Sequence, residues 1–370
     1  MSNLKKVLLI SPPFIPTSRD AVGGAEQMTY NLGRALVEQG HDVHTLARDD
    51  SRVEGTLVPL GLKHTGGKEK ETSQLSTYRQ LTSLVTANYG KFLRENPDTD
   101  VVVDSYSCIG LMRELAEGYG PQVLTRLNLV PKDFLLPEVF EDIKYHLNRN
   151  SSESMLVPIS TSMLEDYTSA FDFSDYNKPL PIVRNSVIAE NFSYNAQPEN
   201  YVLFLGRIEE EKGTHLALKA AKETGNRIIV AGGTSNGHAK DIFLNGNYYH
   251  NKVEPLIDGS VEMFGPANLE QKVDLMRNAK AVLTPIQWNE PGGLVQLEAM
   301  ACGTPVVSYN RGGPAETIIH GKTGFLVDNY ASFVDCLNNI ETISRKDCRE
   351  HIEQNFDYKV MGQNYARLFK

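Results

Sequence analysis

The hydrophobic pattern of the chain is a series of short apolar runs separated by longer stretches of mixed polarity. In the first half these runs predict strands at residues 7–10, 43–46, 101–103, 123–125 and 155–157. Residues 24–39 lie between the first two runs and predict a helix that Gly40 closes. Strands that are apolar on both faces and alternate with helices are typical of a parallel, doubly wound sheet.

The second half of the chain repeats this pattern. Its runs predict strands at residues 201–205, 227–230, 261–264, 281–284, 306–308 and 325–327. Polar linker material separates the halves at residues 193–200. We therefore predict an α/β fold of two Rossmann-like doubly wound domains, residues 1–185 and 186–355, facing each other across a central cleft. Residues 356–370 carry apolar positions at helical spacing and predict a closing helix.

Length and composition agree with this division and exclude some functions. A chain of 370 residues exceeds one ordinary domain. The net charge of −9 argues against a nucleic-acid partner, which would require a basic face. The modestly basic runs 5–6 and 63–70 leave room for a peripheral membrane contact, but no window approaches the roughly 20 apolar residues of a membrane span.

The number and spacing of the cysteines bear on the redox state of the cell compartment. The chain has four, Cys108, Cys302, Cys336 and Cys348, without the close spacing of a metal site. Scattered cysteines of this kind favour a reducing compartment, so we expect a cytoplasmic protein. No histidine pair has carboxylate or cysteine partners at ligand spacing either, and we predict no metal site.

A glycine-bearing loop after the strand at 281–284 carries the first candidate chemistry. Glu290 lies in this loop, and Gly292-Gly293 opens a short helix that Gly303 ends. A paired glycine at a helix start forms a natural cradle for an anion. Glu298 lies inside the helix among apolar neighbours, where a carboxylate needs a bonding partner. Sugar hydroxyls would serve, as would a neighbouring cation, and Glu290 alone could be a loop acid that caps the helix.

The loop after the strand at 201–205 carries two cations. Arg207 and Lys212 flank a run of three acids and precede Gly213, which opens the next helix. Arginine can bind a diphosphate bidentately and lysine adds a point charge beside it. A solvated charge run is the alternative, because Glu209, Glu210 and Glu211 could neutralise both cations.

These two segments, in this order, resemble the retaining nucleotide-sugar glycosyltransferases of the GT-B fold, specifically glycosyltransferase family 4 (glycosyl transferases group 1). The likeness spans nearly the whole chain, is strong over the second half and is thin over residues 50–180. Further matching segments are Gly23-Gly24-Ala25-Glu26, Arg184-Asn185-Ser186-Val187, residues 261–265 and residues 321–327.

The resemblance implies roles for individual residues. Arg207 and Lys212 would bind the donor diphosphate, Glu290 would accept hydrogen bonds from the sugar, and Glu298 would bind the ribose. The first domain would take the acceptor and the second the nucleotide sugar, and the closing helix would return to the first domain; an amphipathic surface helix is the alternative. The remaining donor-site residues implied are backbone positions: Gly23, Gly24, Gly292, Gly293, Leu294 and Val295.

The chain also departs from the family pattern. Histidines expected after the strands at 101–103 and 123–125 are absent, and Gly292 stands where relatives commonly have Phe. The residues found at the two histidine positions, Tyr106, Arg126 and Asn128, are therefore the candidates for the acceptor side.

The function implied is transfer of a sugar, with retention of configuration, from a UDP- or GDP-sugar to an unidentified acceptor. The resemblance favours a UDP-sugar as co-substrate, with no cofactor and no metal. A front-face substitution is the expected mechanism, with Arg207 and Lys212 stabilising charge on the departing phosphate. Two alternatives remain, an isomerase similar to nucleotide-sugar 2-epimerases and a catalytically silent nucleotide-sugar-binding subunit.

Overall fold

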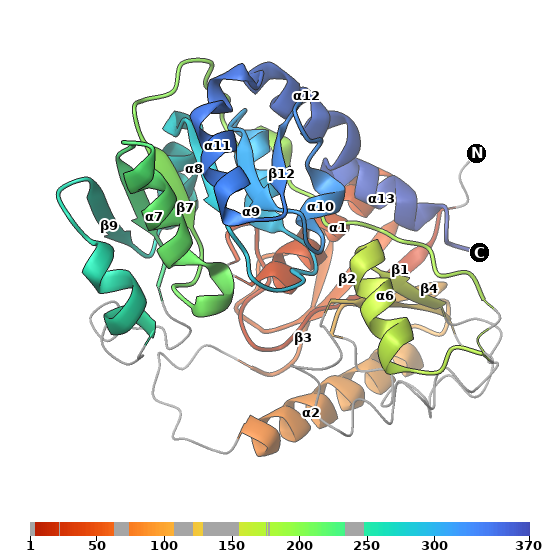
Figure 1. Cartoon of the computed structure of the whole chain (residues 1–370). Helices are drawn as coiled ribbons and strands as arrows, with labels where there is room; N and C mark the ends of the chain where they lie inside the picture. Colours follow the sequence, from red (N-terminus) through yellow and green to blue (C-terminus); the bar gives the residue numbers. More distant parts are fainter. Residues whose placement is uncertain are drawn as a thin grey trace. The chain divides into compact units, whose positions relative to one another are not determined.

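A computed structural model describes residues 4–370 apart from residue 22, 63–73, 107–120, 129–154, 175, 177 and 234–247. The basic run 63–70 considered above therefore lies outside the described residues. The chain divides into two compact units, one formed by Met1–Asn185 with Tyr358–Lys370 and the other by Ser186–Asp357. Figure 1 follows the chain through both units, and each unit is described by itself.

The first unit contains a six-stranded sheet with the order β3-β2-β1-β4-β5-β6, in which every described pairing is parallel. The five strands expected from apolar runs are all present. Thr56–Pro59 was not predicted, because this edge strand is only partly buried and ends in proline, so it lacks an apolar run. The strands are β1 (Lys6–Ile10), β2 (Asp42–Ala47), β3 (Thr56–Pro59), β4 (Val101–Asp104), β5 (Gln122–Leu127) and β6 (Met155–Pro158).

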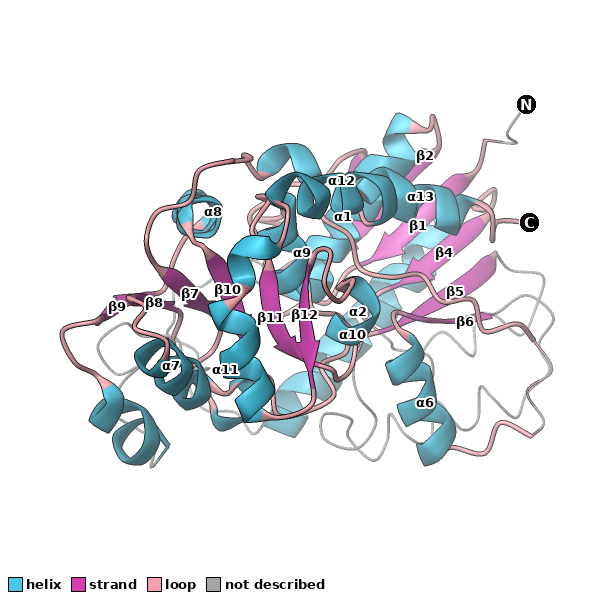
Figure 2. Cartoon of the chain, turned by 45° about the horizontal axis from the view of Figure 1, so that its top comes forward, coloured by secondary structure: helices cyan, strands magenta, loops and turns pink. Residues whose placement is uncertain are grey.

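The helices of the first unit cover both faces of this sheet. Helices α1 and α13 pack together on one face and α2 lies on the other (Figure 2). The closing helix α13 is thus part of the first unit, where the Tyr358 hydroxyl donates to both carboxylate oxygens of Glu38 at 2.7 and 2.8 Å. The bounds are α1 (Gly24–Glu38), α2 (Gln74–Glu95), α6 (Thr161–Ala170) and α13 (Tyr358–Ala366).

The second unit has a parallel sheet of the same kind, with the order β12-β11-β10-β7-β8-β9. All six strands expected from the sequence are present within about two residues of the expected ends, and their side chains form one continuous buried core with the helices. The strands are β7 (Val202–Leu205), β8 (Ile228–Ala231), β9 (Val261–Gly265), β10 (Ala281–Thr284), β11 (Val306–Tyr309) and β12 (Gly324–Val327).

Helices also cover both faces of the second sheet. Helices α7 and α11 pack on one face, and α8, α9 and α12 on the other (Figure 2). This is the arrangement that a doubly wound sheet requires, since the chain reverses its winding direction after β9. The bounds are α7 (Thr214–Glu223), α8 (Leu269–Asn278), α9 (Leu294–Ala301), α10 (Pro314–Thr317), α11 (Tyr330–Asn338) and α12 (Arg345–Asn355), with a short 3-10 helix η2 (Glu210–Lys212).

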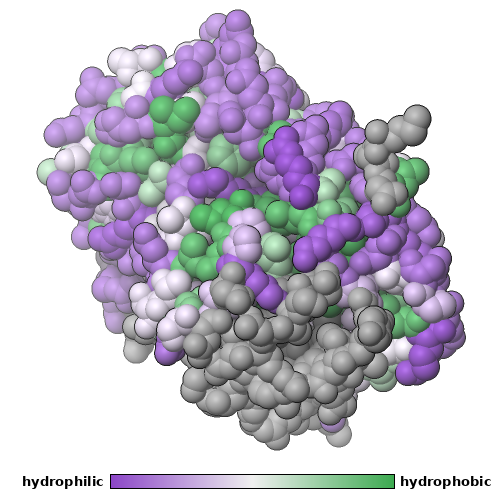
Figure 3. Space-filling view, turned by 90° about the vertical axis from the view of Figure 1, so that its right-hand side faces the viewer, coloured by the Kyte–Doolittle hydropathy of each residue, from purple (hydrophilic) through white to green (hydrophobic). Residues whose placement is uncertain are grey.

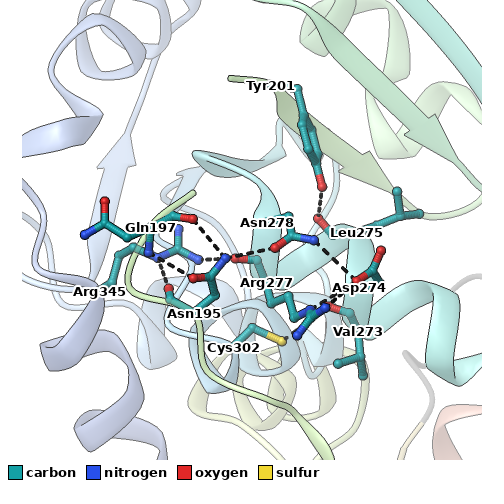
Figure 4. A network of polar contacts seen from close by, with 10 residues as sticks. All are labelled: Asn195, Gln197, Tyr201, Val273, Asp274, Leu275, Arg277, Asn278, Cys302 and Arg345. Carbon is teal, nitrogen blue, oxygen red and sulfur yellow. Dashed lines mark hydrogen bonds and ion pairs between the residues drawn. The ribbon is translucent and has the colours of Figure 1, made fainter. Parts of the chain in front are cut away.

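A hydrogen-bond network around Arg345 lies at the amino-terminal edge of the second sheet (Figure 4). The guanidinium donates to the carbonyl oxygens of Asn195, Ala279 and Arg277 at 2.7, 2.8 and 2.6 Å and to the Thr304 hydroxyl at 2.8 Å. These partners lie just before β7, β10 and β11. The network therefore joins α12 and the polar segment 193–200 to this edge, at the opposite end of the strands from the loops that carry Arg207 and Glu290.

The surface mixes polar and apolar side chains. Figure 3 shows hydrophilic residues interspersed with smaller apolar groups over the described part of one face. The large hydrophobic residues that are exposed within the described ranges are Leu4, Phe14, Tyr194 and Ile319. Within the same ranges, no helix combines the length and apolar character needed to cross a bilayer.

Candidate active site

The strand order of the second unit locates its functional edge. Strand β7 lies at the centre, with β8 and β9 on one side and β10, β11 and β12 on the other. The switch in winding direction therefore falls between β7 and β10, and ligands of such sheets bind in the crevice outside the carboxyl ends of the strands at this point. The loops that follow β7 and β10 carry Arg207, Lys212 and Glu290.

Glycines allow these loops to pack directly on one another. Gly213 is left-handed, with φ of 72°, and a Cβ there would lie 2.1 Å from the carbonyl oxygen of Pro285 in the loop after β10. A Cβ at Gly232, after β8, would lie 1.8 Å from the carbonyl oxygen of Gly206. The backbone N–H of Gln287 completes the contact by donating to the Glu211 carbonyl at 2.7 Å. Any larger residue at Gly213 or Gly232 would push the loops apart.

The loop after β11 supports Glu290 from the other side. Gly313 N donates to the Glu290 carbonyl oxygen at 2.6 Å, and a Cβ at Gly313 would lie 2.7 Å from the Pro291 carbonyl oxygen. Sequence reasoning did not find this support. The signal was the pair Gly312-Gly313 after a predicted strand, but a glycine pair alone does not reveal which loop it touches.

The structure brings Lys212 and Glu290 together. Their side chains form an ion pair, with exposed fractions of only 16% and 19%. The Lys212 ammonium also lies 5.5 Å from the centre of the Trp288 ring. Since Lys212 precedes α7 and Glu290 precedes α9, loop packing alone joins two charges that are 78 residues apart in the sequence.

Arg207 lies on the same loop as Lys212 but has different partners. Its guanidinium is paired with Glu209 and, at 2.8 Å, with Glu211, and 43% of the side chain is exposed. The acidic run thus neutralises the arginine in this structure, as the charge-run alternative expects. An exposed guanidinium with flexible acidic partners can exchange them for phosphate oxygens, because exposed pairs are worth about 0–1 kcal/mol.

Glu298 is the most deeply buried acid of the candidate site. Its side chain is 3% exposed and forms an ion pair with Lys272 of α8. A cation thus supplies the bonding partner that this carboxylate requires. Sequence analysis did not single out Lys272, because nothing in the residues around it shows that α8 packs beside α9.

The start of α9 contains backbone positions that the sequence analysis assigns to the donor site. Gly293 adopts the left-handed conformation with φ of 58° and begins the helix without a side-chain cap. Leu294 and Val295 are the first two helical residues, so their N–H groups have no intrahelical partner. The Gln296 amide nitrogen, in the same turn, is buried and has no hydrogen-bond partner among the described residues. This end of α9 is suited to receive negative charge.

In the first unit, Gly23 and Gly24 form the start of α1, which follows the central strand β1. The Glu26 carboxylate folds back over Gly23, where a Cβ would lie 2.2 Å from Glu26 Oε2. Burial raises the pKa of Glu26 to about 7, a change that the residue's own backbone N–H partly offsets. A larger residue at position 23 would therefore displace the Glu26 side chain, and Glu26 is a titratable group that sequence reasoning did not identify.

The three acceptor-side candidates make internal contacts in the first unit. The Arg126 guanidinium is buried and donates to Asn128 Oδ1 at 2.9 Å, to the Tyr365 hydroxyl at 3.0 Å and to Asn185. Asn128 donates to a backbone carbonyl at 2.8 Å, and the buried Tyr106 hydroxyl bonds to a threonine hydroxyl at 3.0 Å. Arg126 therefore attaches α13 to the sheet, and the polar groups of all three residues make hydrogen bonds within the first unit.

Metal-ligating side chains do not cluster in the described part of the chain. No group of three or more His, Cys, Asp or Glu side chains is gathered there as a metal site would require.

Comparison with known proteins identifies the family. Residues 188–356, which contain both charged loops and the whole of α9, match the family described as "Glycosyl transferases group 1". Residues 188–356 therefore form a group 1 glycosyl transferase domain. The expected class of enzyme is thereby confirmed.

This glycosyltransferase is similar to several curated proteins. It is 29% identical to a glycogen synthase of Mycobacterium tuberculosis (strain H37Rv), over 58% of this chain and 53% of the relative. It is 26% identical to "Alpha-1,3/1,6-mannosyltransferase ALG2" of Dictyostelium discoideum, over 71% of this chain and 64% of the relative. The matched part thus spans about half to two thirds of the length of these relatives.

Solved structures confirm the expected GT-B fold. AviGT4, a glycosyltransferase involved in avilamycin A biosynthesis, is similar with a TM-score of 0.70 and 20% identity, covering 99% of this chain and 97% of AviGT4. Anabaena Alr3699/HepE in complex with UDP and glucose has a TM-score of 0.70 and 16% identity, covering 98% of both chains. At such identities the likeness concerns the fold alone.

Proposed function

We propose that this glycosyltransferase is a family 4 enzyme that transfers a sugar, with retention of configuration, from a nucleotide diphosphate donor to an acceptor hydroxyl. The observation that carries the proposal is the largely buried Lys212–Glu290 ion pair at the switch point of the second sheet, beside the uncapped start of α9. A cation and an acid at a helix N-terminus suit a molecule that carries both phosphates and hydroxyls. Because HepE was crystallised with UDP and glucose, a UDP-sugar is the first donor to test and a GDP-sugar the second.

Each charged residue has a proposed role in donor binding. Lys212 and Arg207 bind the diphosphate, and Arg207 exchanges its two exposed glutamates for phosphate oxygens. Glu290 accepts hydrogen bonds from the sugar hydroxyls, and Glu298 binds the ribose. The N–H groups at the start of α9 contribute partial positive charge to the same site.

The proposed chemistry is a front-face substitution. The bond between the anomeric carbon and the diphosphate oxygen breaks, and a bond from the same carbon to the acceptor oxygen forms on the same face. The departing phosphate oxygen takes the proton of the acceptor hydroxyl. Lys212 and Arg207 act most strongly when negative charge grows on that phosphate, so they lower the barrier and do more than bind the ground state.

A panel of donors tests this proposal. Purified protein is incubated with UDP-glucose, UDP-N-acetylglucosamine and GDP-mannose, and release of free nucleotide is measured without acceptor and with simple saccharide acceptors. A transferase releases UDP or GDP and forms a glycoside. An isomerase similar to 2-epimerases would convert the sugar without forming a glycoside, and a silent subunit would leave every donor intact.

Thermal shifts with UDP, GDP and ADP identify the base independently of catalysis. A ligand present at 100 times its dissociation constant stabilises the folded state by about 2.7 kcal/mol, which is a readily measured shift. If none of the three nucleotides stabilises the protein and none of the donors reacts, the proposed function is wrong.

A further inference from the structure

The pair formed by Glu298 and Lys272 carries an inference about how a nucleotide is recognised. Both residues lie near the carboxyl edge of the second sheet, since Lys272 is the fourth residue of α8 and Glu298 the fifth residue of α9. The two helices pack side by side on one face of the sheet. The Lys272 ammonium is bonded to Glu298 Oε1, and the two side chains are 19% and 3% exposed.

The surroundings of Lys272 hold its side chain in place. A complete capping box between Asn268 and Gln271 fixes the start of α8, one turn before Lys272. The ammonium lies 5.9 Å from the centre of the buried Phe192 ring. Lys272 is therefore confined between an aromatic ring and a carboxylate, which restricts the rotamers of a normally flexible side chain.

The other carboxylate oxygen of Glu298 has no such partner. Within the described residues, Glu298 Oε2 accepts no hydrogen bond. An ionised carboxylate offers about four acceptor positions, so Lys272 leaves most of them available. The pair thus presents an oriented hydrogen-bond acceptor at the edge of the sheet where the nucleotide sugar is proposed to bind.

Stability alone does not account for such a pair. Replacing a buried ion pair by apolar residues of similar volume is often neutral or stabilising, because desolvation offsets the attraction. A half-buried lysine bonded to a buried glutamate on a neighbouring helix therefore suggests a requirement for an oriented charge at this position.

We propose that Lys272 is a positioning residue for the nucleotide ribose. It holds Glu298 by Oε1, so that Oε2 accepts hydrogen bonds from the two ribose hydroxyls. The inference rests on the proposed function, in which Glu298 binds the ribose, and adds that this recognition depends on a cation from a different helix. Lys272 itself touches neither the sugar nor the departing phosphate.

The test compares two ligands that differ only in the hydroxyls concerned. Dissociation constants for UDP and 2′,3′-dideoxy-UDP are measured with the wild-type protein, Lys272→Met, Lys272→Gln and Lys272→Arg. If the thermal-shift panel selects GDP, the corresponding guanosine pair is used. We expect the wild type to prefer UDP by at least tenfold, which corresponds to about 1.4 kcal/mol. The preference should fall below threefold in the Met and Gln variants and should largely remain in the Arg variant.

A half-buried lysine whose carboxylate partner is exposed provides the matched control. Lys280 pairs at 3.5 Å with Glu341, whose side chain is 80% exposed. Lys280→Met should keep the wild-type preference for UDP. In the Lys272 variants the KM for the donor should rise while kcat at saturating donor changes little, because the ribose is remote from the bond that breaks.

Three outcomes would overturn the inference or what it rests on. If Lys272→Met or Lys272→Gln lowers the Tm but keeps the full preference for UDP, Lys272 serves stability only. If the wild type binds UDP and its dideoxy analogue equally, Glu298 does not bind the ribose hydroxyls. If the wild type binds neither UDP nor GDP, the proposed function itself fails, and this is seen before any variant is made.

Discussion

The Lys212–Glu290 pair makes a prediction for both stability and rate. Replacing Lys212 by Met leaves the Glu290 carboxylate in a loop that Gly313 still holds in place. The pair is neither surface nor core, since its side chains are 16% and 19% exposed. Breaking a fully buried pair costs about 3–5 kcal/mol and losing an exposed one about 0–1, so we expect Lys212→Met to lose about 2 kcal/mol of unfolding free energy.

The effect on turnover should be larger than the effect on stability. Lys212 is proposed to stabilise charge that develops on the departing phosphate, and removing one such electrostatic donor costs about 3 kcal/mol. This corresponds to a roughly 150-fold loss in kcat/KM. The rate of nucleotide release with the donor chosen from the panel measures it.

Urea unfolding followed by tryptophan fluorescence measures the stability. The chain has a single tryptophan, Trp288, whose ring lies 5.5 Å from the Lys212 ammonium. The double variant Lys212→Met/Glu290→Gln should be more stable than Lys212→Met alone, because it removes the unpaired carboxylate. Lys222→Met, which breaks an exposed pair with Asp258, should change stability by less than about 0.5 kcal/mol and serves as the control.

Two results would refute this reasoning. If Lys212→Met keeps wild-type kcat/KM, then Lys212 does not stabilise the departing phosphate. If the losses of the two single variants simply add in the double variant, the ion pair does not contribute to the loop structure.

The remaining predictions concern Arg207 with its acidic partners, Glu26 and Arg126. Arg207→Ala should lower kcat/KM roughly 150-fold, which corresponds to about 3 kcal/mol of transition-state stabilisation. Replacing Glu209 and Glu211 by Gln should tighten nucleotide binding, because these acids compete with phosphate for Arg207. A calorimetric titration with UDP that shows weaker binding would contradict this competition. For Glu26, the pKa rises from 4.5 to about 7 on folding, so stability should fall as the pH rises between these values, by up to about 3 kcal/mol. Glu26→Gln should remove this fall, and equal pH dependence of the urea midpoint in variant and wild type would argue against it. Arg126→Met should lose about 3 kcal/mol of unfolding free energy, because it removes three internal hydrogen bonds worth about 1 kcal/mol each. An unchanged urea midpoint would disprove its structural role.

Much of the fold was predictable because its signals are local. A parallel strand covered on both faces must be apolar along its length, so eleven of the twelve strands were visible as apolar runs. Strand β3 was missed because it lies at the sheet edge, where partial burial removes this signal. The helix α9 was predictable from its glycine start and glycine end.

The candidate site was predictable only in part. The loops that carry Lys212 and Glu290 both follow predicted strands of one parallel sheet, so the expected fold placed them at the same edge, and the strand order in the structure makes them neighbours. The support from Gly313 and the pairing of Glu298 with Lys272 were not predictable, because each depends on packing between distant segments. The candidates Tyr106 and Arg126 were named from missing histidines, and their positions in the sequence did not reveal that their polar groups are used internally.

The sequence by itself determined the two doubly wound sheets and the glycine-bearing loops at their carboxyl ends, because apolar runs and glycines act through local sterics and burial. Only the tertiary structure decided which cation neutralises which acid. Arg207 pairs with its neighbours Glu209 and Glu211, Lys212 with Glu290, and Lys272 with the buried Glu298. Electrostatic attraction does not depend on sequence order, so the partner of each charge is set by which loops and helices the packed core brings within a few ångströms.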